Sequence, residues 1–297
     1  MQWSYDITRD GKQISFHGNP LVANDLILIG TDHSCHADGV GHVYAFERET
    51  GKVRWKYLST SVPTDILRIG ENVFFGSFQD RWSAVNLRTG KLAWQFSTGV
   101  VNESCEMIKS HVGDESRFYL TGLDGFIYAL DGTSGQVAWK RKLPAKPSTG
   151  LLLKDRSLFV GTTDKRIYRL KSQTGEIDAE TSVEASPVGR PSFATDAIVF
   201  FLENQSEKRG YITSVATDLR KTHWTQTSTP DWASERPHLT NGLVFAGNCR
   251  GELASFRLSD GAPDRKVTLK GCIRSIGSSD GQLFVGVQEG TVYALRY

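Results

Sequence analysis

The amino-acid sequence predicts an all-β fold: a seven-bladed β-propeller in which each blade is a four-stranded antiparallel sheet. One phrase recurs seven times, at spacings of roughly 40–45 residues, which is the length of four short strands with their turns. The apolar runs within that phrase are too short to be buried helices. The two ends of the chain complement each other as parts of one interrupted repeat. We therefore expect a single propeller domain over residues 1–297.

The second strand of each repeat is predicted from an apolar run of four or five residues, usually ending in glycine. These runs are rich in Val, Ile, Leu and Phe and are bounded by turn-forming Gly, Asn and Asp, whereas a buried helix needs about 10–12 residues. They lie at residues 26–30, 73–76, 118–122, 158–161, 198–202, 243–247 and 283–286. The dipeptides before them, such as Asn24-Asp25 and Asp280-Gly281, form the turn from the first strand.

The third and fourth strands flank a Thr-Gly or Ser-Gly turn, whose glycine tolerates a positive φ angle. The third strand carries Tyr-Ala-Leu or a variant of it, and the fourth carries a tryptophan. The tryptophans concerned are Trp3, Trp55, Trp94, Trp139 and Trp224, while Ala179 and Arg265 occupy that place in the fourth and sixth repeats. One large flat side chain per blade is most simply explained by packing between neighbouring sheets.

The chain ends predict how the ring closes. The seventh repeat stops at Tyr297, just after its third strand, and the chain begins with the Trp-containing segment Gln2-Trp3-Ser4-Tyr5. We expect this N-terminal strand to pair into the last blade and complete it, because closure leaves only short sheet edges exposed.

Three segments of the chain carry a family likeness. They read AFERETGKVRW at 45–55, AVNLRTGKLAW at 84–94 and ALDGTSGQVAW at 129–139. These segments resemble the tryptophan-docking repeat of PQQ-like, or quinoprotein-type, β-propellers, and the resemblance extends over essentially the whole chain. Dehydrogenases of that family bind pyrroloquinoline quinone and calcium and often carry adjacent cysteines. This chain is much shorter and has no adjacent cysteines, so the resemblance implies a non-dehydrogenase member without a cofactor.

Composition excludes several classes of protein. Lys and Arg number 35 against 33 Asp and Glu, which is too small an excess for a dedicated nucleic-acid binder. The sequence has no apolar run of the roughly 18 residues that a membrane-spanning helix requires. Its four cysteines are scattered and its N-terminus does not read as a secretory signal. We therefore expect no disulfide scaffold and a cytoplasmic location, or a periplasmic one if a signal peptide has been removed.

Propeller geometry predicts which loops carry function. The connections between blades and the turns between second and third strands share one face, where ligands of propellers usually sit. The first repeat has an insertion in that turn, over residues 31–42, which contains Asp32, His33, Cys35, His36 and His42. One interpretation is a zinc or other soft-metal site. Because the spacing matches no metal motif, we favour a polar loop that contacts a ligand or partner and expect no metal.

The connections between blades supply a second set of candidate residues on the same face. They are His17, Asn19, Asn102, Glu103, Arg190, Glu235, Arg236 and Arg274. Arg190, Glu235, Arg236 and Arg274 come from neighbouring blades, and arginine forks match carboxylate or phosphate oxygens. They predict an anion site. The alternative is that Arg-Pro at 190–191 and at 236–237 begins the first strand of its sheet, with the arginine paired to a neighbouring Glu.

These observations favour a non-catalytic propeller that serves as a rigid platform for a protein partner or a small polar or anionic ligand. The irregular, charged and His-rich sequence gathers on one predicted face, while the repeats are explained by packing. The alternative is an enzyme, such as a lyase, isomerase or hydrolase, acting on an anionic or sugar-like substrate at the channel mouth. No catalytic residue is assigned, because neither a Gly-x-Ser-x-Gly elbow nor a phosphate-binding loop is present.

Overall fold

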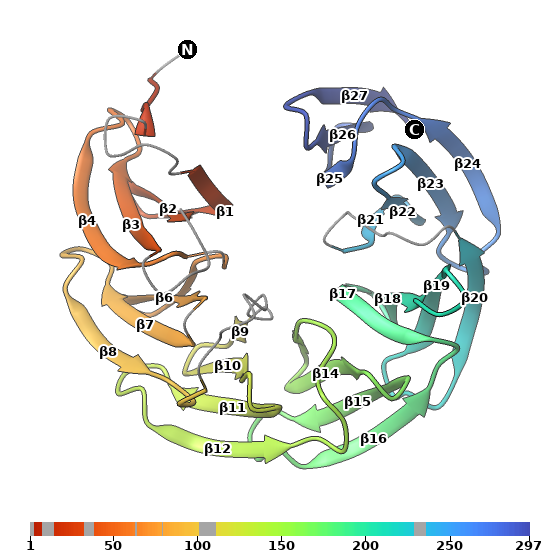
Figure 1. The fold of residues 1–297 in the computed structure, drawn as a ribbon, viewed down its shortest axis with the longest axis horizontal. Coiled ribbons are helices and arrows are strands. Elements are labelled where there is room, and N and C mark those ends of the chain that lie inside the picture. The colour runs from red at the N-terminus through yellow and green to blue at the C-terminus, as the bar shows by residue number, and fades with distance from the viewer. Residues whose placement is uncertain are drawn as a thin grey trace. The chain divides into compact units, whose positions relative to one another are not determined.

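The structure is a computed structural model that describes residues 3–7, 15–32, 39–62, 64–78, 80–100, 111–228 and 236–297. The chain divides into two compact units, residues 1–143 and residues 144–297. Consecutive strands within each sheet are hydrogen-bonded neighbours, and the pairs are antiparallel (Figure 1). In the part of the chain that is described, no helix is long and apolar enough to cross a membrane.

The first unit contains three four-stranded sheets. The first sheet comprises β1 (Ser15–Ala23), β2 (Leu26–Asp32), β3 (Val40–Glu47) and β4 (Val53–Thr60). The second comprises β5 (Leu67–Ile69), β6 (Asn72–Ser77), β7 (Arg81–Asn86) and β8 (Leu92–Phe96). The third comprises β9 (Val112–Gly113), β10 (Arg117–Thr121), β11 (Phe126–Asp131) and β12 (Val137–Lys142).

The second unit contains three four-stranded sheets and one three-stranded sheet. The fourth sheet comprises β13 (Leu152–Lys154), β14 (Ser157–Thr162), β15 (Arg166–Lys171) and β16 (Ile177–Ser182). The fifth comprises β17 (Ser186–Ala194), β18 (Ala197–Asn204), β19 (Arg209–Ala216) and β20 (Thr222–Ser228). The sixth comprises β21 (His238–Thr240), β22 (Leu243–Gly247), β23 (Glu252–Arg257) and β24 (Pro263–Thr268). The last comprises β25 (Ile273–Ser279), β26 (Gln282–Val287) and β27 (Val292–Arg296).

The core lies between successive sheets, because the middle strands of each sheet are apolar on both faces. In the first unit, one cluster joins Val43 of the first sheet to Phe75 of the second, and another joins Phe74 of the second sheet to Leu120 of the third. In the second unit, similar clusters join the fourth sheet to the fifth, the fifth to the sixth and the sixth to the seventh. A single sheet therefore has no core of its own, and its stability depends on its neighbours.

The repeated tryptophans connect these sheets, as the sequence predicts. Trp55 of β4 lies against Gly90 in the second sheet, and its indole Nε1 donates a hydrogen bond of 2.9 Å to the carbonyl oxygen of Leu87. Trp94 of β8 bonds Gly132 of the third sheet in the same way, and Trp224 of β20 bonds Leu258 of the sixth. Each indole thus covers the turn between the third and fourth strands of the following sheet.

Trp3 makes this same contact with the first sheet. It lies against Gly51, and its Nε1 donates a 2.8 Å hydrogen bond to the carbonyl oxygen of Arg48. The N-terminal segment therefore lies on the first sheet as the fourth strand of a preceding sheet would. Residues 3–6 have no assigned strand, and the seventh sheet has three strands. Pairing between this segment and the seventh sheet remains a prediction.

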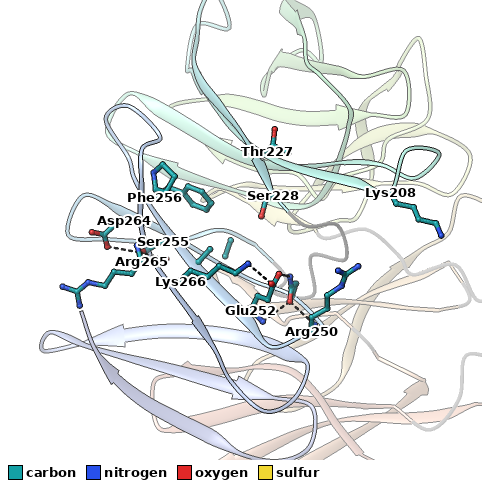
Figure 2. A pocket seen from close by; sticks show the side chains of 14 residues that line it. Lys208, Thr227, Ser228, Arg250, Glu252, Ser255, Phe256, Asp264, Arg265 and Lys266 are labelled. Carbon is teal, nitrogen blue, oxygen red and sulfur yellow. Dashed lines mark hydrogen bonds and ion pairs between the residues drawn. The ribbon is translucent and has the colours of Figure 1, made fainter.

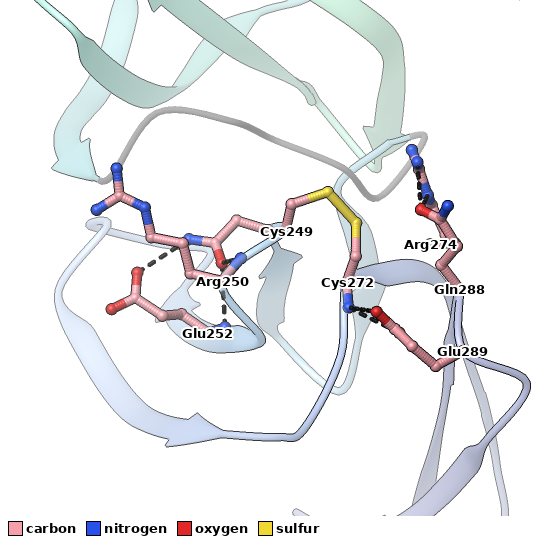
Figure 3. Close-up of a disulfide and its surroundings, with 8 residues drawn as sticks. Cys249, Arg250, Glu252, Cys272, Arg274, Gln288 and Glu289 are labelled. Atoms are coloured by element: carbon pink, nitrogen blue, oxygen red, sulfur yellow. Dashed lines mark hydrogen bonds between the residues drawn. A yellow bond between two sulfur atoms is a disulfide. The ribbon is translucent and has the colours of Figure 1, made fainter.

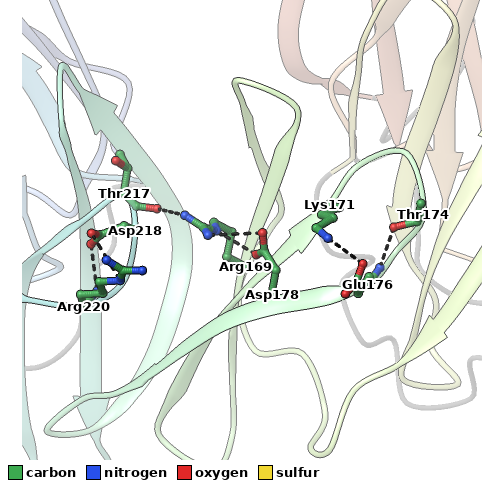
Figure 4. A network of polar contacts seen from close by, with 8 residues as sticks. All are labelled: Arg169, Lys171, Thr174, Glu176, Asp178, Thr217, Asp218 and Arg220. Carbon is green, nitrogen blue, oxygen red and sulfur yellow. Dashed lines mark hydrogen bonds and ion pairs between the residues drawn. The ribbon is translucent and has the colours of Figure 1, made fainter.

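In the fourth sheet the large side chain stands on the third strand and the small one on the fourth, where other sheets have tryptophan. Across the last two strands of the first, second and fifth sheets a small residue faces tryptophan, as Ala45 faces Trp55, but here Arg169 faces Ala179. The guanidinium of Arg169 donates a hydrogen bond of 3.1 Å to the carbonyl oxygen of Thr217 in the fifth sheet (Figure 4). Asp178 accepts two further bonds from Arg169 and holds it in place. Arginine thus supplies the inter-sheet bond that an indole supplies elsewhere.

The tryptophan contact predicts different effects for alanine at two glycines of the sixth sheet. Gly261 and Gly242 have nearly equal φ angles, 72° and 73°, so alanine strains the backbone similarly at both. A Cβ atom at Gly261 would lie 2.6 Å from Trp224 Cδ2, whereas a Cβ atom at Gly242 would have no neighbour within 4 Å. We expect Gly261→Ala to lower the free energy of unfolding by about 2 kcal/mol more than Gly242→Ala, measured by urea unfolding. Equal losses would show that the indole does not constrain this turn.

Candidate functional site

A groove between the fifth and sixth sheets is the candidate site. Its volume is about 690 Å³, and it lies beside the end of β20 and the strands β22, β23 and β24 (Figure 2). Two turns add Lys208 from the fifth sheet and Arg250 from the sixth. Such a volume falls within the range of ligand pockets in proteins, about 300–1,000 Å³.

The groove exists because the sixth sheet has two small residues at a pair of positions where every other sheet has at least one large side chain. Ala246 of β22 pairs directly with Ala254 of β23, and both line the groove. The corresponding pairs in the other sheets are Ile29 with Tyr44, Phe75 with Ser83, Leu120 with Tyr128, Val160 with Tyr168, Phe200 with Thr213 and Val285 with Tyr293. The alanine pair therefore leaves an unfilled space beside β22 and β23, on the side of the sixth sheet that faces the fifth.

The fifth sheet does not fill the space from its own side. In the first sheet, Tyr57 follows Trp55 by two residues and its ring packs on Phe75 of the next sheet, with ring centres 5.7 Å apart. In the second sheet, Phe96 packs on Tyr128 in the same way, at 5.1 Å. The residue two positions after Trp224 is Gln226, which has no ring to place over the alanine pair.

The rim of the groove carries an excess of positive charge. Its basic residues are Lys208, Arg250, Arg265 and Lys266, against the acidic Glu252 and Asp264. Both carboxylates have partners within the sixth sheet. Glu252 accepts from Lys266 Nζ at 2.6 Å and from Asn248 Nδ2 at 2.9 Å, and Asp264 accepts from the Ser255 hydroxyl at 2.9 Å. The groove therefore combines a small apolar floor with a cationic rim.

A second hollow, of about 510 Å³, lies near the ends of the fourth and fifth sheets, but its charges are balanced. Arg166 pairs with Glu180, Arg169 with Asp178, and Arg220 with Asp218. These partners satisfy one another and leave no net charge to attract a ligand. The groove beside β24 is therefore the better candidate.

A disulfide braces the turn that forms one side of the groove. Cys249, between β22 and β23, is bonded to Cys272, which precedes β25 of the seventh sheet (Figure 3). The same turn accepts backbone hydrogen bonds at the carbonyls of Asn248 and Gly251. Arg250 thus projects from a segment tied to the seventh sheet. The expectation that the cysteines form no disulfide is wrong for this pair, because folding brings together residues that scattered spacing keeps apart.

The structure places the predicted site residues of the first unit separately. His17 lies in β1, where its backbone pairs with Gly30. Asn19 follows it and donates to Asp65 from both its backbone and its side-chain nitrogen, at 2.8 and 3.1 Å. Asp32 ends β2, and His42 lies in β3, where its backbone nitrogen donates to Thr31 Oγ1.

Six predicted site residues lie outside the described part of the chain. They are His33, Cys35, His36, Asn102, Glu103 and Glu235. The metal hypothesis rests on three of them and stays untested. Among the residues that are described, no group of three His, Cys, Asp or Glu is arranged to hold a metal ion.

The three predicted arginines of the second unit fall on or beside the first strands of their sheets. Arg190 lies in β17, Arg274 lies in β25, and Arg236 is exposed two residues before β21. Arg274 donates twice to Gln288 Oε1 (Figure 3). The sequence reasoning overlooked His238, whose Nε2 lies 2.9 Å from the Ser278 hydroxyl. Burial, and secondly the charge of Arg236, lower the pKa of His238.

Sequence reasoning also overlooked the groove, because it sought irregular loops. The signal was present within the repeats. When the third strands are aligned, the residue before the one that faces the tryptophan position is tyrosine in four repeats and alanine only at Ala254. A departure from the repeat, rather than an insertion, marks this site.

Comparison with known sequences identifies a family. Residues 2–177 and 79–296 match, in two overlapping placements, the family described as outer membrane protein assembly factor BamB. The BamB of Legionella pneumophila (strain Paris) is 25% identical over 187 residues, covering 59% of this chain and 45% of that protein. The BamB of Yersinia pestis is 23% identical over 213 residues, covering 67% and 51%. The chain thus spans about half the length of these relatives.

Comparison with solved structures confirms the predicted fold class, a seven-bladed β-propeller. The crystal structure of BamB from Moraxella catarrhalis matches 95% of this chain and 83% of its own, with a TM-score of 0.77 and 17% identity. The C-terminal WD40 domain of Sif2 matches 96% and 82%, with a TM-score of 0.76 and 11% identity. At these identities the likeness shows the fold alone.

The expectation of a cytoplasmic location is wrong. The matched relatives are outer membrane protein assembly factors, which a cytoplasmic location does not fit. The bond between Cys249 and Cys272 agrees with this correction, since disulfides persist in oxidising compartments such as the periplasm.

Removing the disulfide is expected to destabilise the second unit. The bond closes a loop between residues 23 positions apart, and the chain-entropy relation gives about 3 kcal/mol for a loop of that length. We expect Cys249→Ser with Cys272→Ser to lower the free energy of unfolding by about that amount in urea titrations. An unchanged unfolding midpoint would show that the hydrogen bonds of this turn suffice.

The lowered pKa of His238 predicts a loss of stability in mild acid. An unfolded chain protonates this imidazole below its ordinary pKa of 6.5, whereas the folded chain keeps it neutral to lower pH. Stability should therefore fall as the pH drops below 6.5, and the loss should stop growing below the folded-state pKa. We expect the melting temperature to fall more in the wild type than in His238→Gln between about pH 7.5 and 5.5. Parallel declines would contradict this origin.

Proposed function

Because this chain belongs to the BamB family of outer membrane protein assembly factors, we propose that it is a scaffold that binds a protein partner during outer membrane protein assembly. We propose further that the partner docks in the groove beside β24. The observation that carries this proposal is a groove whose apolar floor, at Ala246 and Ala254, is surrounded by basic side chains and supported by buried strands.

The framework suits a scaffold because it holds the groove without the help of a ligand. Ala246 has no exposed surface, and Phe256 and Trp224 beneath the groove are buried in the cluster between the fifth and sixth sheets. The turn that carries Arg250 is braced by the disulfide. A preformed surface lowers the entropic cost of binding, since few side chains must be ordered.

The character of the groove favours a protein partner over a small molecule. Protein interfaces combine an apolar centre with a polar rim, and here two alanines and Phe256 are surrounded by charged side chains. The groove is also bordered by β24, whose residues are exposed throughout. A segment of polypeptide can contact the floor, the rim and this strand together.

An anion site at Arg190, Arg236 and Arg274 stays a second proposal. Its support is their position at the first strands of three successive sheets and the influence of Arg236 on the pKa of His238. Against it, Arg274 already donates to Gln288. The groove has the stronger support.

The proposed function predicts an assembly defect in cells that lack this chain. Outer-membrane β-barrel proteins should fall in amount in the source organism after deletion, and the wild-type chain should restore them. Reversing two rim charges, by Lys208→Glu with Arg265→Glu, should prevent restoration, because charge complementarity across an interface directs partner binding. Folded barrel protein can be measured by its heat-modifiable migration in gels.

The matched control reverses a charge outside the groove. Arg220 is 87% exposed in the second hollow, so Arg220→Glu should restore β-barrel proteins as well as the wild type does. Full restoration by the double groove variant would rule out docking at this rim. Unchanged barrel proteins after deletion would rule out the proposed function.

A further inference from the structure

We propose that the groove binds an extended acidic segment of a partner protein and takes one aromatic side chain of that segment over Ala254, the half-buried member of the pair Ala246–Ala254. The identity of the segment as part of an assembly partner rests on the proposed function. Its chemistry, extended backbone, aromatic anchor and flanking carboxylates, rests on the groove itself.

The aromatic anchor is inferred from what fills the same level elsewhere in the molecule. Between the first and second sheets the ring of Tyr57 lies on Phe75, and between the second and third the ring of Phe96 lies on Tyr128. At the fifth and sixth sheets, Gln226 takes the place of Tyr57 and Phe96, while Ala246 takes the place of Phe75 and Ala254 that of Tyr128. Two rings are therefore missing from one boundary, and a ring from outside restores the packing that the repeat makes internally. Aromatic anchors also dominate the energetics of protein interfaces.

The extended backbone is inferred from β24. It is an edge strand of its sheet, paired on one side to β23, and its six residues are all exposed. An edge strand presents unpaired backbone donors and acceptors to which an extended segment can add as a further strand. Alternate side chains of such a segment point to one face, so a single ring reaches the alanine floor while its neighbours lie at the rim.

The acidic flanks are inferred from the charges of the rim. Glu252 is engaged by Lys266 and Asn248, and Asp264 is engaged by Ser255. Lys208 in a turn of the fifth sheet and Arg265 in β24 both line the groove, and Arg265 also lines a smaller hollow that faces the seventh sheet (Figure 2). Carboxylates that flank the ring match these two basic residues. The basic residues of β24 also oppose pairing of this edge with another copy of itself.

The test uses synthetic peptides rather than an unidentified partner. The probe is a fluorescein-labelled peptide of nine residues in which one phenylalanine stands between Thr residues and is flanked by Asp and Glu. Its two matched controls replace the phenylalanine by alanine or every acidic residue by lysine. Binding to the purified full chain is measured by fluorescence anisotropy. We expect each control peptide to bind at least about tenfold more weakly than the probe, which corresponds to about 1.4 kcal/mol.

One variant fills the groove with a residue that the fold already uses at this position. Ala254→Tyr introduces the tyrosine found at Tyr44, Tyr128, Tyr168 and Tyr293, so the sheet should still fold, as its melting temperature will show. We expect this variant to lose probe binding by at least about tenfold. Should it unfold, Lys208→Glu with Arg265→Glu provides the second test, with Arg220→Glu as the control that retains binding.

Two results would overturn the proposal: unchanged binding to a folded Ala254→Tyr variant, or equal binding of the acidic and lysine peptides. The proposed function fails separately, through unchanged outer-membrane proteins in cells lacking the chain. If Ala254→Tyr loses the probe and deletion leaves those proteins unchanged, the groove chemistry stands and the proposed function falls.

Discussion

In the first, second and fifth sheets, an indole lies on the turn of the following sheet and holds the two sheets together. Each sheet has apolar middle strands but no core of its own, so it must bury both faces against neighbours. Trp55, Trp94 and Trp224 fix how three of the sheets meet the next one, each with one hydrogen bond to a carbonyl and one face against a glycine. Such a directional contact specifies spacing and register that apolar burial alone leaves open.

Because the repeat is so regular, its departures carry most of the information about function. The pair Arg169–Ala179 keeps the inter-sheet bond while exchanging its chemistry, and this explains the absence of tryptophan there without any functional role. At the pair Ala246–Ala254, no other side chain of the fold replaces the large residues found in the other sheets, and a groove stays open. Where another side chain makes up for the change from the repeat, the change serves packing. Where no side chain does so, the change indicates a binding site for a partner.

Much of the fold could be predicted from the sequence, and little of the site. The period, the apolar runs and the Thr-Gly turns are local signals, so seven sheets and the inter-sheet role of the tryptophans followed from them. Trp3 lies on Gly51 as the other repeated tryptophans lie on the following sheet, whereas its pairing with the seventh sheet stays a prediction. The site depends on pairs such as Cys249 with Cys272, or Gln226 with Ala254, that only folding brings together. Loop insertions drew attention to residues 31–42, whereas the groove came from two small residues within regular strands.

The sixth sheet shows how one substitution bears on both stability and binding. Arg265 stands in β24 at the position where other sheets have tryptophan, and its partner across the strands, Ser255, keeps the usual small size. Loss of an inter-sheet indole costs about 3–5 kcal/mol by comparison with large-to-small substitutions in cores. The disulfide between Cys249 and Cys272 joins the same two sheets and contributes about 3 kcal/mol, so it offsets a comparable amount. The disulfide thus joins the two sheets that an indole at this position would otherwise join. Arg265 lines both the groove beside β24 and a smaller hollow that faces the seventh sheet.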